Sequence, residues 1–124
     1  MGAMMLKSVW GEFRTPSKRN PDPHHRGATG IWHAALGAIP GLVLADYGGW
    51  PVFVTVPFLV TVYMYKELGD VFRGGSVSDS LEDAVFVAMG AIAAYFDALY
   101  GLITVNIAAI FVVSLQIQGN KKNG

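Results

Sequence analysis

The chain contains no cysteine, and only 15% of its 124 residues are charged. The absence of cysteine excludes disulfide scaffolds, thiolate zinc sites and cysteine nucleophiles. A water-soluble domain usually carries about 25% charged residues, so this chain has too few to cover a surface that faces water. Because 52% of the residues are hydrophobic and the mean hydropathy is +0.40, a surface that faces lipid resolves the shortage.

Net charge is also absent, since nine Lys and Arg residues balance nine Asp and Glu residues. The basic residues are spread along the chain, whereas a nucleic-acid-binding domain gathers them into a patch or stripe. We therefore expect no nucleic-acid partner, and we expect the lipid bilayer to be the main surrounding of the chain.

Lys and Arg are missing from two of the segments that connect the apolar runs, those around residues 46–50 and 97–101. The basic residues lie before the first run, between the second and third runs, and after the last: Lys7, Arg14, Lys18, Arg19, Arg26, Lys66, Arg73, Lys121 and Lys122. Short basic segments stay on the cytoplasmic side of a membrane. The pattern predicts a multi-pass protein of the bacterial inner membrane with both termini in the cytoplasm.

The apolar runs predict an all-α, polytopic membrane helix bundle. Four short spans are expected, at about residues 28–45, 52–65, 84–96 and 102–117. An unbroken helix over residues 84–117 would be about 51 Å long, well beyond a hydrocarbon core of about 30 Å. A break at residues 95–101 therefore favours four spans over the alternative, three spans with one long last helix.

Three regions are expected along the chain. Residues 1–27 form a cytoplasmic N-terminal segment, in which a short interfacial amphipathic helix near residues 3–14 precedes an extended, proline-containing linker. Residues 28–118 form the transmembrane bundle, and residues 119–124 form a basic cytoplasmic tail.

The connection between the second and third spans carries clear helix stop and start signals. The second span is expected to continue as a helix to about residue 72, where Gly74-Gly75-Ser76 ends it. The next helix is expected to begin at Asp79 or Ser80, because these residues fit D-x-x-E and S-x-x-D capping patterns.

Small residues recur along the first predicted span and reappear in the third. The candidates for close helix packing are Gly30, Ala34, Gly37, Gly41 and Gly90. Small side chains let the backbones of two membrane helices approach closely. They predict close helix contacts, either within one chain or between copies of it.

Some polar and aromatic residues are assigned by their predicted depth in the membrane. Trp32, Tyr63 and Tyr65 are expected as anchors at the membrane–water interface. Asn106 lies inside the fourth predicted span, and we expect its side chain to hydrogen-bond a neighbouring helix.

Ionisable residues gather at the predicted cytoplasmic ends of the first three spans. The candidates for one shared polar site are His33, Lys66, Glu67, Asp70, Arg73, Glu82 and Asp83. Ionisable groups at membrane depth are costly and are usually paired or functional. Each residue also has a purely structural interpretation, since Lys66 and Asp70 could form an i,i+4 ion pair and Glu82 could favour a helix N-terminus.

Two kinds of ligand suit this set of side chains. Carboxylates assisted by an imidazole can bind a divalent metal, and the candidate ligands are His33, Glu67, Asp70 and Asp83. Lys66 and Arg73 could instead bind a phosphate or a lipid head group. The sequence contains no H-E-x-x-H motif, P-loop or dinucleotide-binding fingerprint, so whether the chain is an enzyme stays open.

The layout of these residues resembles the VanZ-like group of small bacterial membrane proteins. The resemblance covers roughly residues 30–92 and consists of His33, Glu67 in "YKELGD", Arg73 in "FRGGS", Asp83 in "SLEDAVF" and Gly90-Ala91. Asp70 and Phe86 depart from that group, which commonly has Gln and Asn at these places. The resemblance implies a helical membrane protein associated with the cell envelope and with glycopeptide tolerance.

Two other classes of protein stay open. Phage holins are also small, multi-span and poor in cysteine, with a basic tail, and they form oligomers, which the small-residue stripes would suit. A non-catalytic subunit that docks on a larger membrane complex would share this composition. A holin does not need an acidic and basic cluster at one interface, so the cluster favours the VanZ-like interpretation.

Overall fold

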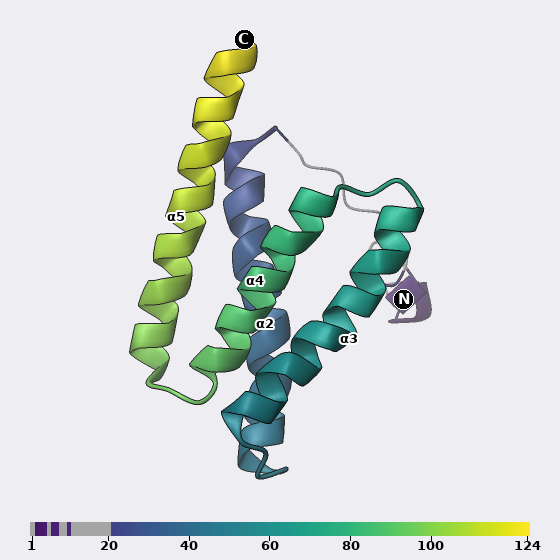
Figure 1. Ribbon diagram of the computed structural model, residues 1–124, viewed down its shortest axis with the longest axis vertical. Helices are drawn as coiled ribbons and strands as arrows, with labels where there is room; N and C mark the ends of the chain where they lie inside the picture. The colour runs from purple at the N-terminus through teal and green to yellow at the C-terminus, as the bar shows by residue number, and fades with distance from the viewer. Residues whose placement is uncertain (1, 5, 8–9, 11–20) are drawn as a thin grey trace.

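The computed structural model describes residues 2–4, 6–7, 10 and 21–124. Four long helices follow one another: α2 (Pro23–Asp46), α3 (Val52–Phe72), α4 (Val77–Ala93) and α5 (Ala98–Asn123). Consecutive helices run in opposite directions (Figure 1). One end of the molecule therefore contains four helix ends: the start of α2, the end of α3, the start of α4 and the end of α5. The predicted all-α helix bundle is confirmed.

Three of these helices, α2, α3 and α5, are long and apolar enough to cross a membrane. Helix α4 has 17 residues, which corresponds to about 26 Å, and it carries three acidic residues near its start. The fourth predicted span, α4, stays a prediction. The alternative of one long last helix is wrong, because α4 ends at Ala93 and the Asp97 side chain caps a new helix by accepting a hydrogen bond from the Leu99 N–H.

The starts of α2 and α4 differ from the sequence-based expectation. Helix α2 begins at Pro23, five residues early, because Asp22 accepts a hydrogen bond from the His24 N–H and proline suits the first helical position. The expected extended linker is therefore wrong from residue 23 onward. Helix α4 begins at Val77, since Ser76 rather than Asp79 or Ser80 is its N-cap.

The N-terminal expectations fall largely outside the described residues. The expected interfacial helix near residues 3–14 is described only at residues 3–4, 6–7 and 10. Arg14, Lys18 and Arg19 lie outside the described residues, so the cytoplasmic placement of that basic segment stays a prediction.

Helices α2 and α4 pack against each other at the centre of the bundle, and α3 and α5 lie on opposite sides of this pair (Figure 1). Two apolar clusters fill the interfaces. One joins α2, α4 and α5 and contains Ala34, Phe86, Val105 and Val112, and the other joins α3 and α4 and contains Tyr63, Ala84 and Val87.

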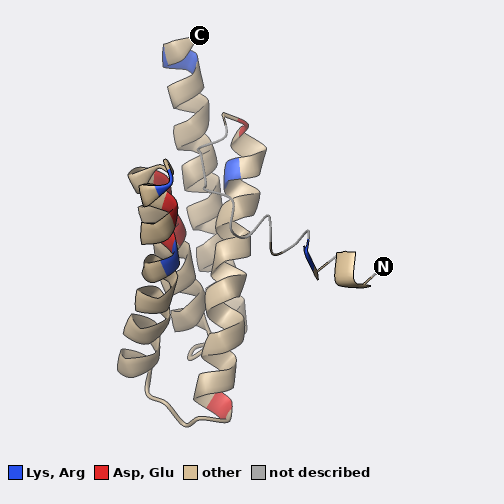
Figure 2. Ribbon diagram, turned by 90° about the vertical axis from the view of Figure 1, so that its right-hand side faces the viewer, with Lys and Arg blue, Asp and Glu red and all other residues tan. Residues whose placement is uncertain are grey.

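The outer surface of the bundle is apolar along most of its length. On α5 only Val105, Ala109, Val112 and Gln116 are buried, while Leu102, Ile107, Ile110 and Phe111 are exposed. Charged residues concentrate toward the end of the bundle where the C-terminus lies (Figure 2). We call this the charged end. An apolar belt with charges at an end is the distribution expected of a membrane protein, which supports the membrane assignment.

Candidate functional site

The contact between α2 and α4 sets the geometry of the charged end. A β-carbon on Gly37 would lie 1.9 Å from the carbonyl oxygen of Val87, and one on Gly90 would lie 1.7 Å from that of Ala34. The two backbones therefore touch at both glycines. The packing candidates from the sequence are all buried in α2 and α4: Gly30, Ala34, Gly37, Gly41 and Gly90.

Helix α3 presents one polar face to this pair. Residues three or four positions apart share a helix face, so Tyr63, Lys66, Glu67 and Asp70 point the same way. Glu67 and Asp70 are completely buried. The Lys66 ammonium bridges them, with its Nζ 2.8 Å from Glu67 Oε1 and 2.7 Å from Asp70 Oδ2. The Arg73 guanidinium, at the rim, forms an ion pair with Asp70 Oδ1.

His33 on α2 and Asp83 on α4 form a second buried pair. The Nδ1 atom of His33 lies 2.7 Å from the carbonyl oxygen of Thr29 and 3.4 Å from Asp83 Oδ1. Because a carbonyl oxygen only accepts, Nδ1 carries the proton in this arrangement. The Thr29 contact thereby fixes the orientation of the imidazole ring beside Asp83.

Tyr63 connects the two pairs. Its ring makes an edge-to-face contact with the His33 ring, with centroids 5.5 Å apart. Its hydroxyl lies beside the Glu67 carboxylate and within electrostatic reach of Asp83. The structure thus brings together side chains from α2, α3 and α4, which we call the core polar cluster: His33, Tyr63, Lys66, Glu67, Asp70, Arg73 and Asp83.

The hydrogen bonding of the core polar cluster is incomplete within the part of the chain that the structure describes. The Tyr63 hydroxyl, Glu67 Oε2 and Asp83 Oδ2 are buried and make no hydrogen bond there. Asp70 Oδ2 differs, because the Lys66 ammonium lies 2.7 Å from it as an ion-pair partner. Buried polar atoms without a partner are costly, so these oxygens mark the chemically unsatisfied part of the cluster.

The charges of the core polar cluster do not balance. The carboxylates of Glu67, Asp70 and Asp83 face one ammonium, Lys66, and one guanidinium, Arg73. Asp79, outside the cluster, lies within electrostatic reach of Asp83. With these three carboxylates ionised and the imidazole neutral, the described members of the core polar cluster carry one net negative charge.

Glu82, a candidate for the same site, belongs to a different cluster. Its carboxylate forms an ion pair with Arg26 of α2, whose Nη1 also lies 3.3 Å from Gln116 Oε1 of α5. Gln116 Nε2 donates to Asn120 Oδ1, and Asn120 Nδ2 donates to the carbonyl oxygen of Pro21. These contacts connect the start of α2 with α4 and α5. They therefore hold three helices together beside the core polar cluster.

The sequence interpretation missed Tyr63 as part of the site and assigned it to the membrane interface. That assignment is wrong, because Tyr63 is 8% exposed. Trp32 and Tyr65, which received the same assignment, are 59% and 83% exposed. The spacing of the residues could have indicated that Tyr63 belongs to the site, since it lies four residues before Glu67 and shares its helix face.

The expected interhelical hydrogen bond of Asn106 is also wrong. Its side chain is exposed and donates to the carbonyl oxygen of Leu102 in its own helix. Thr104 and Ser114 likewise bond to carbonyl oxygens four residues earlier. A short polar side chain on a helix can donate its hydrogen bond to a carbonyl oxygen of the preceding turn. The presence of a polar residue therefore did not predict a contact with another helix.

The geometry limits both ligand hypotheses, the metal bound by four side chains and the phosphate bound by Lys66 and Arg73. Within the described ranges, no group of three or more His, Asp or Glu residues is arranged to hold a metal ion. A metal enclosed by His33, Glu67, Asp70 and Asp83 together is therefore not what the side chains form. Lys66 and Arg73 are both engaged by carboxylates, which leaves little positive charge for a phosphate.

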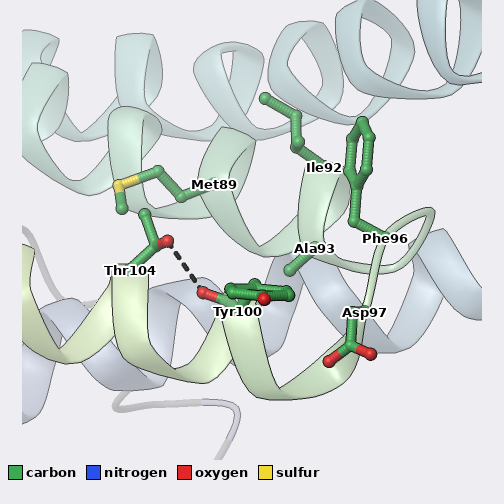
Figure 3. A pocket seen from close by; sticks show the side chains of 8 residues that line it. Met89, Ile92, Ala93, Phe96, Asp97, Tyr100 and Thr104 are labelled. Atoms are coloured by element: carbon green, nitrogen blue, oxygen red, sulfur yellow. Dashed lines mark hydrogen bonds between the residues drawn. The ribbon is translucent and has the colours of Figure 1, made fainter.

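Two hollows in the described part of the surface lie away from this chemistry. A pocket of about 470 Å³ opens between α4 and α5 at the opposite end of the bundle (Figure 3) and is lined by Met89, Ile92, Ala93, Phe96, Asp97, Tyr100, Gly101 and Thr104. A second hollow, of about 330 Å³, lies between α2, α4 and α5. Neither contains a member of the core polar cluster. Their linings are largely apolar, as at the lipid-facing surface of a membrane protein.

Comparisons with family models, with curated proteins and with solved structures find no match for this chain.

Proposed function

We propose that the chain is a small multi-pass protein of the bacterial inner membrane, of the VanZ-like type, that acts through the core polar cluster at its cytoplasmic end. The observation that carries this proposal is the burial of ionisable side chains from three helices in one place. Glu67 and Asp70 come from α3, His33 from α2 and Asp83 from α4.

A purely structural role accounts poorly for this cluster. Replacing a buried ion network with apolar residues of similar volume is often neutral or stabilising, so burial of charge is not required to hold helices together. Glu67 and Asp83 each retain a buried carboxylate oxygen with no hydrogen bond among the described residues. An ionisable group kept at membrane depth with unsatisfied atoms indicates a function.

The layout that resembles the VanZ-like group supports the proposal from the sequence side. His33, Glu67, Arg73 and Asp83 carry that resemblance, and these residues converge although up to 50 positions separate them. The basic segments at the charged end, which include Lys121 and Lys122, support a cytoplasmic position for that end.

The small-residue stripes provide little support for a holin. Gly37 and Gly90 are used within the chain, where they let α2 and α4 touch. Gly30 lies against the Phe86 ring, so a β-carbon there would be 2.6 Å from it. These residues are therefore not available as a surface for association between copies.

The proposal can be tested by expression in a glycopeptide-susceptible bacterial host. We expect the wild-type chain to raise glycopeptide tolerance several-fold while the membrane potential is maintained. Asp83→Asn should abolish the effect at unchanged abundance in the membrane fraction. Asp46→Asn, the same change at an exposed position at the opposite end, should keep it.

Three outcomes would overturn parts of the proposal. An abrupt collapse of the membrane potential, with release of a co-expressed endolysin, would replace it with the holin function. Unchanged tolerance with the wild-type chain would remove the VanZ-like role. Full tolerance with Asp83→Asn would show that the core polar cluster does not carry the function.

A further inference from the structure

We propose that the core polar cluster binds one hydrated divalent cation of the hard, oxygen-preferring class, such as Mg²⁺ or Mn²⁺, through Glu67 Oε2 and Asp83 Oδ2. This inference rests on the proposed function, because it names the ligand of the same site. It depends on which carboxylate oxygens already have partners, on the charge balance and on the number of protein ligands available.

The partnered oxygens leave two free positions on facing helices. Glu67 Oε1 is taken by Lys66 at 2.8 Å, and both oxygens of Asp70 are taken by Lys66 and Arg73. Asp83 Oδ1 faces His33 at 3.4 Å. Glu67 Oε2 and Asp83 Oδ2 remain, on α3 and α4, and both are buried without a hydrogen bond among the described residues. These are the atoms that a bound ion would contact.

The sign of the missing charge is positive. When they are ionised, the three carboxylates face one ammonium and one guanidinium within the described core polar cluster, which leaves one net negative charge. Excess charge of one sign is costly away from water unless it is paired. A cation at Glu67 and Asp83 offsets the excess, whereas a phosphate would increase it.

The number of protein ligands selects the class of cation. A structural zinc site uses four protein ligands, and within the described residues no three His, Asp or Glu side chains are placed to share a metal. Magnesium retains several waters and is usually held by one or two carboxylates. A pair of carboxylate oxygens therefore fits a hydrated ion of the Mg²⁺ class.

His33 and Tyr63 have positioning roles in this site. His33 Nδ1–H donates a hydrogen bond to the Thr29 carbonyl oxygen, which keeps the ring beside Asp83 Oδ1. The unpartnered Tyr63 hydroxyl lies beside the Glu67 carboxylate. It is placed to hydrogen-bond a water of the hydrated ion or the Glu67 carboxylate itself.

The test uses the purified full-length chain in detergent, freed of metal by a chelator, with Mn²⁺ as a paramagnetic probe at constant ionic strength. Electron paramagnetic resonance should detect one saturable Mn²⁺ per chain, displaced by Mg²⁺ but not by Na⁺. Glu67→Gln and Asp83→Asn should each weaken Mn²⁺ binding at least tenfold. Asp46→Asn and Asp97→Asn are the matched controls and should bind Mn²⁺ as the wild type does.

A charge-preserving variant keeps the test decisive if a neutral variant fails to fold. Asp83→Glu retains the carboxylate but displaces its oxygens, and we expect it to fold and to bind Mn²⁺ several-fold more weakly.

Three results would overturn the inference: the absence of saturable Mn²⁺ binding, equal binding by folded Asp83→Asn, or stabilisation by inorganic phosphate instead. If Asp83→Asn abolishes tolerance while the wild type binds no Mn²⁺, only the cation inference fails. If the wild type binds Mn²⁺ but Asp83→Asn keeps tolerance, only the proposed function fails.

Discussion

Gly90 lies so close to Ala34 that a β-carbon on the glycine would be 1.7 Å from the alanine's carbonyl oxygen. The contact joins the backbones of α4 and α2. It also sets the spacing at which Asp83 and His33 meet, since these residues lie on the same two helices. A side chain at position 90 would have to push the helices apart, because a backbone carbonyl cannot move aside alone.

Gly90→Ala is therefore expected to destabilise the bundle by about 1–3 kcal/mol or more, the usual cost of overpacking a core. Gly69→Ala on α3 is the matched control, because a β-carbon there has nothing within 4 Å. That control should raise stability by about 0.5–1 kcal/mol, the gain from replacing glycine in a helix. Unfolding in mixed detergent measures both changes. Equal effects of the two substitutions would contradict the close contact.

Two threonines on α3 should respond differently to replacement by valine. Thr55 is completely buried and hydrogen-bonded to the Tyr95 hydroxyl, which itself donates to the Trp50 carbonyl oxygen. We expect Thr55→Val to lower the free energy of unfolding by about 1 kcal/mol, the net value of a hydrogen bond. Thr61 is exposed and bonds only to the Pro57 carbonyl oxygen of its own helix. Thr61→Val should change the free energy of unfolding little, and a larger loss there than at Thr55 would be inconsistent with these bonds.

The Arg26–Glu82 ion pair should show energetic coupling. Both side chains are largely buried, at 12% and 17% exposure, so removing either partner takes this ion pair from a charge that is largely shielded from water. Arg26→Gln and Glu82→Gln should each cost about 1–3 kcal/mol, less than the about 3–5 kcal/mol of a fully buried pair. A double-mutant cycle should give a coupling of about 0.5–3 kcal/mol. Lys122→Gln, at an exposed position in the last turn of α5, is the control. Strictly additive losses would mean that the two side chains do not interact in the membrane.

The membrane topology can be tested directly, because the chain has no cysteine of its own. Single cysteines at Ser76 and Asn123, both at the charged end, should react with an impermeant maleimide only from the cytoplasmic side. Cysteines at Tyr47 and Leu99, which are exposed at the other end, should react only from outside. The result at Leu99 decides whether α4 crosses the membrane, since labelling there from the cytoplasm would limit the chain to fewer than four spans.

Local features of the sequence determined the helical architecture. Gly74-Gly75 and the segment around Asp97 predicted where helices end and begin, because turn and capping residues act through their own backbone. Uninterrupted apolar runs predicted the long helices for a similar reason, since lipid leaves a backbone no partner except its own helix. Helices α2 and α4 begin a few residues earlier than the sequence predicted. Asp22 and Ser76 cap them, in place of the residues that the sequence indicated as helix starts.

The partners of the ionisable side chains were decided only by the tertiary structure. Glu82 and Asp83 are adjacent in sequence, yet Glu82 pairs with Arg26 and Asp83 faces His33. Successive residues on a helix point about 100° apart, so the rotation of α4 about its own axis selects these partners. That rotation is set by the contact of Gly90 with the α2 backbone. Sequence composition could therefore predict that charges gather at one end of the bundle, whereas helix packing determined which carboxylate oxygens remain unpaired there.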